Sequence, residues 1–400
     1  MRKIAIAGAG VAGLASAILL KRAGYAVQVF DQVADPTPVG AGLLLQPSGQ
    51  AVLKKLGLLE QVRAQAAVIE CLQGYSGNWC TLDLHYAALG QDWHGLGIHR
   101  ASLHNILWQA ASASGVELHL GTALHTFQIQ ADSVQLNLAQ GAAQFDALII
   151  ANGTRSQLRE QLPISQSYRP YPWGAYWAVL DSDDWPHIAS LKQRYRGAHQ
   201  LLGILPTGRN PLTGRRCYSL FWSLPRSEFA QLQQQGIEPL IGKIRLLWPE
   251  VADWFASAAE TKIAIADYAD VRLQNLQHEN VLVIGDAAHA MSPQLGQGAN
   301  MALIDAYILA QSLQANDNIK QAFQQFTQRR AKHIAYYQFA SRIMTPLYQS
   351  HYPIAWLRDA GTVLGRHIGP VYRQYLLTLC GAKQGIWDFK AGIDELLDLN

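Results

Sequence analysis

The chain has 400 residues, of which 49% are hydrophobic and 15% charged, and its formal net charge is +3. This composition indicates a compact globular protein of about two domains, and it argues against a disordered or nucleic-acid-binding chain. No stretch of about 18 apolar residues occurs, so no membrane span is expected.

The cysteines and histidines give no sign of a metal site. The four cysteines lack metal-like pairing, and three histidines recur every five residues, a spacing that brings them together on neither a helix nor a strand. These residues are Cys71, Cys80, Cys217, Cys380, His94, His99 and His104. Unpaired thiols favour a reducing compartment, so we expect a cytoplasmic protein, and the first apolar segment is interpreted as a strand rather than a signal peptide.

Residues 3–30 form a strand, a glycine-rich turn, a helix and a second strand that ends at an acid. In the pattern GxGxxG, Gly8 permits the tight turn, Gly10 lets the backbone approach a pyrophosphate, and Gly13 lets helix and strand pack closely. Asp31 is placed to accept hydrogen bonds from an adenosine ribose. The neighbours expected to contact the same dinucleotide are Val11, Ala12 and Gln32. The acid argues against NADP here, because a 2′-phosphate would meet a carboxylate.

Two kinds of segment alternate in the middle of the chain: helices and strands that continue the first part, and strands expected to form a second sheet. A loop containing Gly42 and Gln46 precedes a helix near 48–56, and two strands are expected within 71–99. A helix over 103–113 is followed by strands near 116–120, 123–129, 132–138 and 144–150, with Leu124 at the cofactor. Aromatic-rich segments 173–180, 199–205 and 216–222 then predict a second sheet that covers a pocket.

A second specific element spans residues 281–313. Asp286 follows a short apolar strand and can hold a ribityl hydroxyl. Pro293 breaks the chain, and a glycine-opened helix then points its N-terminus at an electron-rich ring, where it stabilises negative charge. The cofactor contacts expected from this element are Gly285, Asp286, Pro293, Gly296, Gly298, Ala299 and Asn300. Helical patterns continue from 319 to about 348 and beyond.

Together, the GxGxxG turn and the run GDAAHxxxPxxGQGxN around residue 290 resemble the class A flavoprotein monooxygenases, the para-hydroxybenzoate hydroxylase type. Arg100 matches an arginine that lies near the flavin phosphates in that family, and residues 145–159 match a strand and turn normally written with Asp-Gly. Here Asn152 replaces the acid. The amide keeps hydrogen bonding but loses the charge, which weakens the transfer of pyridine-nucleotide use from the family.

The resemblance implies an α/β fold, with a Rossmann-like FAD domain of the glutathione-reductase type, an interleaved sheet domain and C-terminal helices. The expected FAD domain is discontinuous and comprises 1–70, 100–165 and 271–345. Residues 71–99 and 166–270 form the expected substrate-binding sheet, and 346–400 a helical segment. A helix near 354–372 is expected to pack on its own domain rather than touch a membrane.

The implied activity is hydroxylation of a small aromatic substrate, phenol-like or heteroaromatic. FAD is the bound cofactor, O2 the co-substrate and NADH or NADPH the transient reductant, and oxygen transfer proceeds through a flavin hydroperoxide. Pro293 borders the reactive edge of the flavin. Tyr218, Leu220 and Trp222 share one strand face by period two, and Tyr218 is the candidate to hydrogen-bond the substrate during catalysis.

Several alternatives stay open. The three strand residues could be ordinary core aromatics and aliphatics, and Gln46 and His199, the other candidate substrate contacts, could be a turn residue and a packed histidine. The enzyme could catalyse another oxidation, epoxidation or reduction, or could accept externally reduced flavin. The remaining alternative is a protein that binds flavin without catalysing a reaction. A monomer or homodimer is expected, without a nucleic-acid partner or a metal.

Overall fold

A six-stranded, mainly parallel sheet carries the glycine-rich turn. The computed structural model describes residues 1–35, 41–138, 141–229, 234, 238–257, 263–351, 353–388 and 392–397. The strand order is β18-β19-β12-β1-β2-β8, and only β18 runs antiparallel to its neighbour. In that order the strands are Gln277–His278, Val281–Val283, Ala147–Ile150, Lys3–Ala7, Ala26–Phe30 and Glu117–His119. Strands from both ends of the sequence therefore lie side by side.

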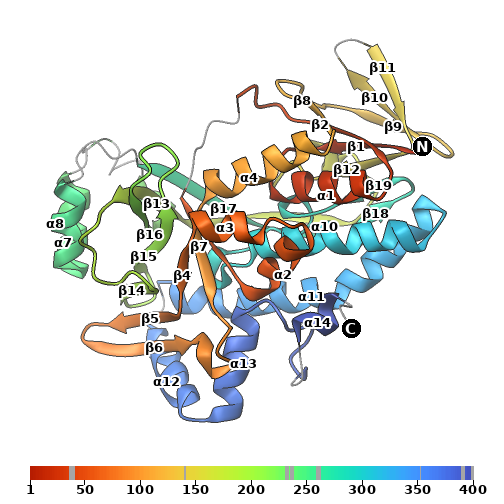
Figure 1. Ribbon diagram of the computed structural model, residues 1–400. Helices are drawn as coiled ribbons and strands as arrows, with labels where there is room; N and C mark the ends of the chain where they lie inside the picture. Colours follow the sequence, from red (N-terminus) through yellow and green to blue (C-terminus); the bar gives the residue numbers. More distant parts are fainter. Residues whose placement is uncertain are drawn as a thin grey trace.

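Helices and a small sheet complete this part of the molecule (Figure 1). Helix α1 packs against α10 and α4, and α10 also contacts α2 and α11. The antiparallel sheet β11-β10-β9 contributes Val134, Leu136 and Phe145 to the same hydrophobic core. These elements are α1 (Val11–Arg22), α2 (Pro47–Lys55), α3 (Leu59–Gln65), α4 (Arg100–Ala113), α10 (Gly298–Ala315), α11 (Ile319–Tyr348), β9 (Phe127–Ile129), β10 (Val134–Leu138) and β11 (Gly141–Phe145).

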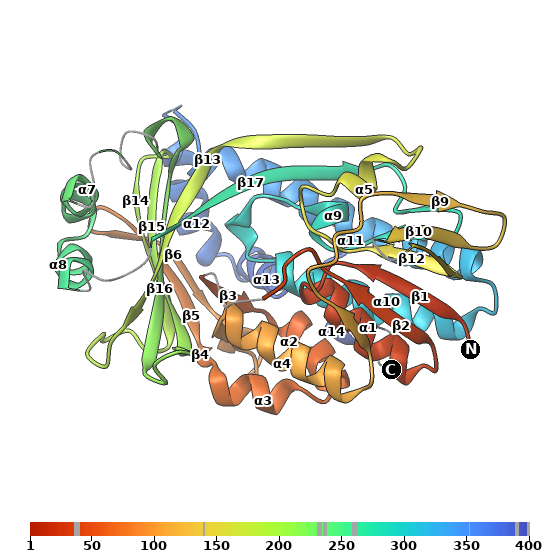
Figure 2. The ribbon, with the colours of Figure 1, turned by 90° about the horizontal axis from the view of Figure 1, so that it is seen from above.

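A seven-stranded sheet forms the second part, in the order β17-β13-β16-β15-β14-β5-β6. All its pairings are antiparallel except that of β14 with β5. In that order the strands are Ala264–Leu273, Gln166–Asp181, Arg216–Pro225, Gln200–Arg209, Ser190–Arg196, Cys71–Ser76 and Trp79–His85. Figure 2 shows α7 (Glu238–Leu247) and α8 (Pro249–Ser257) on the outer side of this sheet, away from the dinucleotide-binding part.

Short elements and the C-terminal helices connect the two parts. The sheet β3-β7-β4 lies between them, and α12 and α13 pack near β6 at the end farthest from the N-terminus (Figure 1). These elements are β3 (Gly42–Leu45), β4 (Ala67–Ile69), β7 (Gly95–His99), α5 (Gln157–Glu160), α9 (Asp286–His289), α12 (Ala355–Arg366), α13 (Gly369–Leu379) and α14 (Ile393–Leu397), with 3-10 turns Tyr86–Ala88, Arg226–Glu228 and Pro293–Leu295. Within the described ranges, no helix combines the length and hydropathy needed to cross a bilayer.

The predicted fold class is confirmed: an α/β dinucleotide-binding part and a separate sheet of aromatic-rich strands are both present. Two details differ from the expectation. Helices α7 and α8 cover a face of the second sheet where no helix was predicted. Strand β9 begins at Phe127 rather than near 123, so Leu124 lies in the loop before it.

Candidate functional site

One cavity of about 1510 Å³ extends from the glycine-rich turn to the second sheet. Its first half is lined by residues that the sequence assigned to a dinucleotide. The lining includes Gly8, Gly10, Val11, Ala12, Asp31, Gln32, Gly42, Arg100, Leu124, Asn152, Asp286, Pro293, Gly296, Gly298 and Ala299. The fold thus gathers segments that lie more than 250 residues apart in the sequence around one space.

The glycines of the first turn serve different needs. Gly8 has a φ of +108°, and a Cβ there would lie 2.5 Å from the Ala151 carbonyl oxygen. A Cβ on Gly13 would lie 1.9 Å from the Gly8 oxygen, so Gly13 permits close packing and does not itself line the cavity. A Cβ on Gly10 would meet no atom within 4 Å, which leaves open space beside the backbone. No side chain caps α1, so its first N–H groups remain available to an anion.

Asp31 is held rigidly at the end of β2. The backbone N–H of Ala9 donates to Asp31 Oδ2 at 2.7 Å, and that of Val33 donates to Oδ1 at 2.9 Å. Two backbone bonds fix the plane of the carboxylate, whose remaining lone pairs can accept from vicinal hydroxyls. This geometry suits a ribose.

Asp286 also lines the cavity, from a different element than Asp31. It begins α9 directly after Gly285, whose φ of +62° brings the backbone close to Ala12 of α1. The backbone N–H of Gly285 is bound to Asp305 Oδ2 at 2.8 Å, so Gly285 shapes the turn and does not line the cavity. No side chain caps α10, which begins at Gly298 and points its N-terminus toward the cavity.

A buried ionic network supports this second element from behind. Asp305 accepts from Arg330 Nε at 2.7 Å, and His289 Nε2 lies 2.7 Å from its other oxygen. Burial opposes ionisation of Asp305, yet the charges of His289 and Arg330 lower its pKa far below the usual range. Burial, reinforced by Arg330, lowers the pKa of His333, which continues the network to the Gly381 carbonyl at 3.0 Å. His289 thus supports the turn.

The turn around Asn152 is tied to the same element. Asn152 is exposed to the cavity just after β12. The fully buried Arg159 donates through Nη1 to the Thr154 carbonyl at 3.0 Å and to that of Ala287 at 3.1 Å. Arg159 therefore holds the Asn152 turn against α9.

The second half of the cavity lies under the seven-stranded sheet and is mainly apolar. Its walls include Trp177, Phe221, Met291 and Leu205, together with Tyr268. Trp177 Nε1 donates to the Tyr268 hydroxyl at 2.9 Å, and burial raises the pKa of Tyr268 to about 12. Tyr268 is therefore protonated at neutral pH and keeps its own proton to donate.

A few polar groups converge on this apolar space. Gln349 Nε2 donates to Ser223 Oγ at 2.9 Å, and both residues line the cavity. Gln349 Oε1 and Ser292 Oγ are buried at the lining, and neither has a hydrogen-bond partner in the described part of the chain. Buried polar atoms without partners are costly, so a ligand that supplies these bonds would be stabilised. No periodic pattern in the sequence indicated these polar residues, which are Tyr268, Ser223, Gln349 and Ser292.

The substrate contacts expected on β16 do not face the cavity. These residues are Tyr218, Leu220 and Trp222. They do share a face, as period two requires, but that face packs against α7 and α8 in a separate hydrophobic cluster. Their alternates Phe221 and Ser223 face the cavity. The expectation failed because both faces of β16 are buried, one by helices that sequence periodicity did not reveal.

Three further predicted residues also lie outside the cavity lining. Gln46 is fully buried and accepts from the Tyr86 hydroxyl at 2.7 Å. Asn300 accepts from the Gln46 backbone N–H at 2.8 Å and donates to two carbonyls, so it fixes the loop between β3 and α2. His199 is an exposed residue near His351, and partial desolvation of its ring, together with the charge of Arg196, lowers its pKa.

Comparisons with known proteins agree with this geometry. The family model described as "FAD binding domain" matches residues 1–334. 3-Hydroxybenzoate 6-hydroxylase of Polaromonas naphthalenivorans (strain CJ2) is 26% identical over 371 residues, which cover 87% of this chain and 88% of that protein. 6-Hydroxynicotinate 3-monooxygenase of Bordetella bronchiseptica (strain RB50) is 26% identical over 326 residues, covering 77% and 81%.

The solved structures extend the likeness to the fold. Klebsiella pneumoniae HpxO, crystallised with FAD and uric acid, superposes with a TM-score of 0.78 at 19% identity. The superposition covers 94% of this chain and 97% of that one. At this identity the likeness concerns the arrangement of the elements.

Proposed function

Because the chain belongs to the FAD binding domain family and is an FAD-dependent monooxygenase, we propose that it hydroxylates an aromatic substrate with O2 and electrons from NADH or NADPH. The observation that carries this proposal is the single cavity with two unlike halves. One half offers glycines, helix N-termini and two carboxylates, and the other offers aromatic and aliphatic walls with few polar groups. A dinucleotide cofactor and an apolar ring fit those halves respectively.

The residues present fit FAD in a definite order along the cavity. Asp31 would hold the adenosine ribose, Gly10 and the α1 N-terminus the pyrophosphate, and Asp286 a ribityl hydroxyl. The α10 N-terminus and the turn at Pro293 would border the isoalloxazine, where helix polarity favours negative charge. When bound, FAD supplies the transfer of electrons to O2 that allows one oxygen atom to reach the ring.

The second half of the cavity would exclude water and orient the ring. The rings of Trp177 and Phe221 form one wall, with centroids 5.2 Å apart and planes tilted by 36°. The Tyr268 hydroxyl, which accepts from Trp177, can donate to a substrate oxygen. Ser223, Gln349 and Ser292 would satisfy further polar substituents. The family relatives 3-hydroxybenzoate 6-hydroxylase and 6-hydroxynicotinate 3-monooxygenase, by their names, act on hydroxylated rings, which supports a phenol-like or heteroaromatic substrate.

A compound panel tests this proposal. Purified FAD-loaded protein is incubated with phenols and hydroxylated heteroaromatics, NADH or NADPH, and 18O2, and products are analysed by mass spectrometry. We expect a product heavier by one 18O atom together with stoichiometric pyridine-nucleotide oxidation. Intact FAD with no oxygenated product across the panel would favour a different oxidation.

Asn152 favours a second possibility for the source of electrons. The position lines the cavity without the charge that the resembling family places there. Under this alternative, reduced flavin arrives from another protein and NAD(P)H is used poorly. Supplying chemically reduced FAD to the same panel separates the two routes, because only the alternative predicts product without any pyridine nucleotide and little product with it.

A further inference from the structure

A second cavity lies on the outer side of the seven-stranded sheet, next to α8. Its volume is about 600 Å³, which is within the range of roughly 300–1,000 Å³ that is usual for small-molecule sites. We call it the outer aromatic pocket and define it by three tryptophans, a tyrosine and two cations: Tyr75, Trp185, Lys192, Arg194, Trp248 and Trp254. These six residues do not line the cavity of the proposed reaction.

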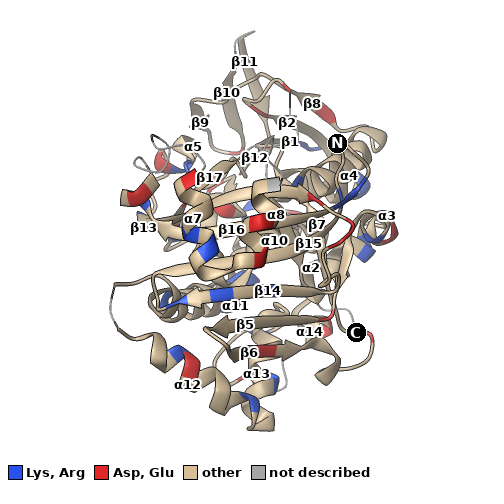
Figure 3. Cartoon of the chain, turned by 90° about the vertical axis from the view of Figure 1, so that its left-hand side faces the viewer, with Lys and Arg blue, Asp and Glu red and all other residues tan. Residues whose placement is uncertain are grey.

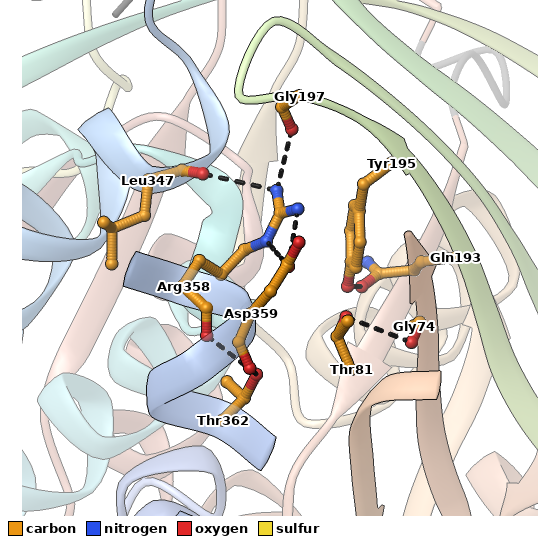
Figure 4. A network of polar contacts seen from close by, with 9 residues as sticks. All are labelled: Gly74, Thr81, Gln193, Tyr195, Gly197, Leu347, Arg358, Asp359 and Thr362. Carbon is orange, nitrogen blue, oxygen red and sulfur yellow. Dashed lines mark hydrogen bonds and ion pairs between the residues drawn. The ribbon is translucent and has the colours of Figure 1, made fainter. Parts of the chain in front are cut away.

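Strand β14 is a wall that the two cavities share. Lys192 and Arg194 line the outer aromatic pocket, whereas Gln193, which lies between them, lines the cavity of the proposed reaction. Figure 4 shows the inner face of the strand, where the Tyr195 hydroxyl donates to Gln193 Oε1 at 2.7 Å and the Arg358 guanidinium lies 4.3 Å from the centre of the Tyr195 ring. The outer aromatic pocket is therefore a separate site.

Trp185 is at the centre of the aromatic lining. Its ring stacks on that of Trp254, with centroids 4.8 Å apart and planes within 14°, and it meets Trp248 edge to face at 5.8 Å. Trp248 lies between α7 and α8, and Trp254 belongs to α8. Rings that pack on one another in this way are held firmly, and they offer apolar contact to another planar ring.

Two cations of β14 lie beside these rings. The Arg194 guanidinium is 5.3 Å from the centre of the Trp248 ring and 5.9 Å from that of Tyr75, and Lys192 Nζ is 5.4 Å from the Tyr75 ring. Figure 3 shows basic positions on β14 next to α7, and α7 contacts this strand. The pocket therefore combines an aromatic surface with positive charge.

The charges of Lys192 and Arg194 have no acidic partner. Among the described residues neither side chain forms an ion pair: Arg194 Nη1 donates to the Gly77 carbonyl at 3.3 Å, and Lys192 Nζ donates to Gln73 Oε1 at 2.5 Å. Arg194 Nε is buried and has no hydrogen-bond partner in that part of the chain. A cation that has lost part of its water without gaining a counterion is destabilised, so an anion beside it would be bound favourably.

The other titratable groups of the pocket favour an anion with a single charge. Asp184 and Glu250 also line the pocket, but both are exposed, so water and salt screen their charges. Burial, reinforced by the charge of Lys192, lowers the pKa of His187, which is therefore neutral at neutral pH. A carboxylate gains more from the two half-buried cations than it loses to the exposed acids, whereas the acids repel a phosphate dianion twice as strongly.

We propose that the outer aromatic pocket binds a small planar aromatic molecule that carries one carboxylate. The ring packs among Trp185, Trp248 and Trp254, and the carboxylate accepts hydrogen bonds from Arg194 and Lys192. The proposal goes beyond the hydroxylation proposed above and does not depend on it, because binding at the outer side of the sheet is measured without turnover.

Equilibrium dialysis with the full-length, FAD-loaded protein tests this proposal by counting the bound molecules per chain. The probes are 2-naphthoate and two molecules of similar shape, the neutral 2-naphthamide and the cationic 2-naphthylmethylamine. We expect the outer aromatic pocket to bind 2-naphthoate roughly tenfold more tightly than 2-naphthamide, because ionised acceptors form the stronger hydrogen bonds. The amine should bind most weakly. Changes in flavin absorbance report separately on any probe that enters the cavity of the proposed reaction.

Arg194→Gln should remove one bound 2-naphthoate per chain, and Lys192→Gln should weaken the same binding. Arg196→Gln is the matched control, because Arg196 is an exposed arginine two positions further along β14 that does not line the pocket. It should bind 2-naphthoate as the unaltered protein does. Unchanged flavin absorbance and melting temperature show that the variants are folded.

Three outcomes would overturn the proposal. The first is the same number of bound 2-naphthoate molecules in the Arg194 and Lys192 variants as in the unaltered protein. The second is an equal loss in the Arg196 variant. The third is binding of 2-naphthamide or 2-naphthylmethylamine at this pocket that is as tight as that of 2-naphthoate, which would show that the two cations do not select the ligand.

Discussion

Asp286 and Asp31 both line the cavity, and they differ in how their carboxylates are held. Asp31 is fixed by two backbone N–H donors, whereas Asp286 is exposed toward the cavity at the start of α9. A carboxylate in that position depends on its ligand for hydrogen bonds. Removal of the Asp286 carboxylate should therefore lower the affinity for the cofactor more than the stability of the fold.

We predict that Asp286→Ala yields protein that is colourless or nearly so after purification. Loss of a hydrogen bond to a charged group costs about 1.5–3 kcal/mol, or roughly 10- to 150-fold in FAD affinity. The ratio of flavin to protein absorbance and a fluorescence titration with FAD measure the effect. Asp253→Ala, a change at an exposed acid on α8, is the control and should stay yellow. Full colour and unchanged affinity in the Asp286 variant would contradict the assigned ribityl contact.

A substitution at position 152 tests the effect of the missing charge. Asn152→Asp should raise the rate at which NADH or NADPH is oxidised if the amide limits that rate, because the substitution restores the acid that the resembling family carries. Stopped-flow reduction of the bound flavin by NADH and NADPH measures this rate. An unchanged rate would show that the amide is tolerated and that the electron source is determined elsewhere.

At the scale of single elements, strand β16 shows how far sequence patterns reach. The pattern predicted the strand and correctly placed Tyr218, Leu220 and Trp222 on one face. It could not tell which face turns to the cavity, because nearly every residue of β16 is buried and the cavity is lined by polar Ser223 as well as by Phe221. A period of two determines which residues share a face, whereas the choice of face depends on α7 and α8, which follow β16 in the sequence and pack back onto it.

A pair of alanine substitutions on β16 should separate the two faces. Leu220→Ala should lower the free energy of unfolding by about 2–5 kcal/mol through a cavity under α7 and α8, with kcat/KM of the folded protein little changed. Phe221→Ala should instead lower kcat/KM or the yield of product per NAD(P)H oxidised. Chemical denaturation and product analysis measure the two effects. The reverse assignment of effects would return Leu220 to the substrate side.

The most accurate predictions of helices and strands came from motifs that require several features at once. The turn at Gly8–Gly13 and the run from Gly285 to Asn300 both specify glycines, a strand before and a helix after, and helix 319–348 was predicted with the bounds that α11 has. Tyr268, Ser223 and Gln349 lie on three different elements, and no local pattern brings them together. Their meeting depends on how the two parts of the molecule pack.

At the scale of the whole molecule, the buried network around Asp305 joins elements that are remote in sequence. It links α9, α10 and α11 with the segment at Gly381. The folded-state pKa of Asp305 is lower than its unfolded value of 3.8, so its ionisation stabilises the fold above that pH. This contribution declines as the pH falls below 3.8 and is lost as the pH approaches the lower folded-state pKa.

We predict that Asp305→Asn lowers the free energy of unfolding at neutral pH by about 3–5 kcal/mol, because Arg330 and His289 lose their buried partner. The difference from the unaltered protein should shrink as the pH falls below the unfolded value of 3.8, where the wild-type carboxylate loses its advantage. Denaturation measured from pH 2 to 8 gives both quantities. Asp253→Asn serves as the exposed control. A difference that stays constant with pH would contradict the assigned ionisation of Asp305.

Backbone carbonyls at residues 379–381 accept hydrogen bonds from Gln297, Ser48 and His333. These donors belong to the turn before α10, the start of α2 and the network behind Asp305. The polar contacts of these three donors are therefore incomplete until segment 379–381 has packed against them. We expect FAD to be held tightly only after that segment has docked.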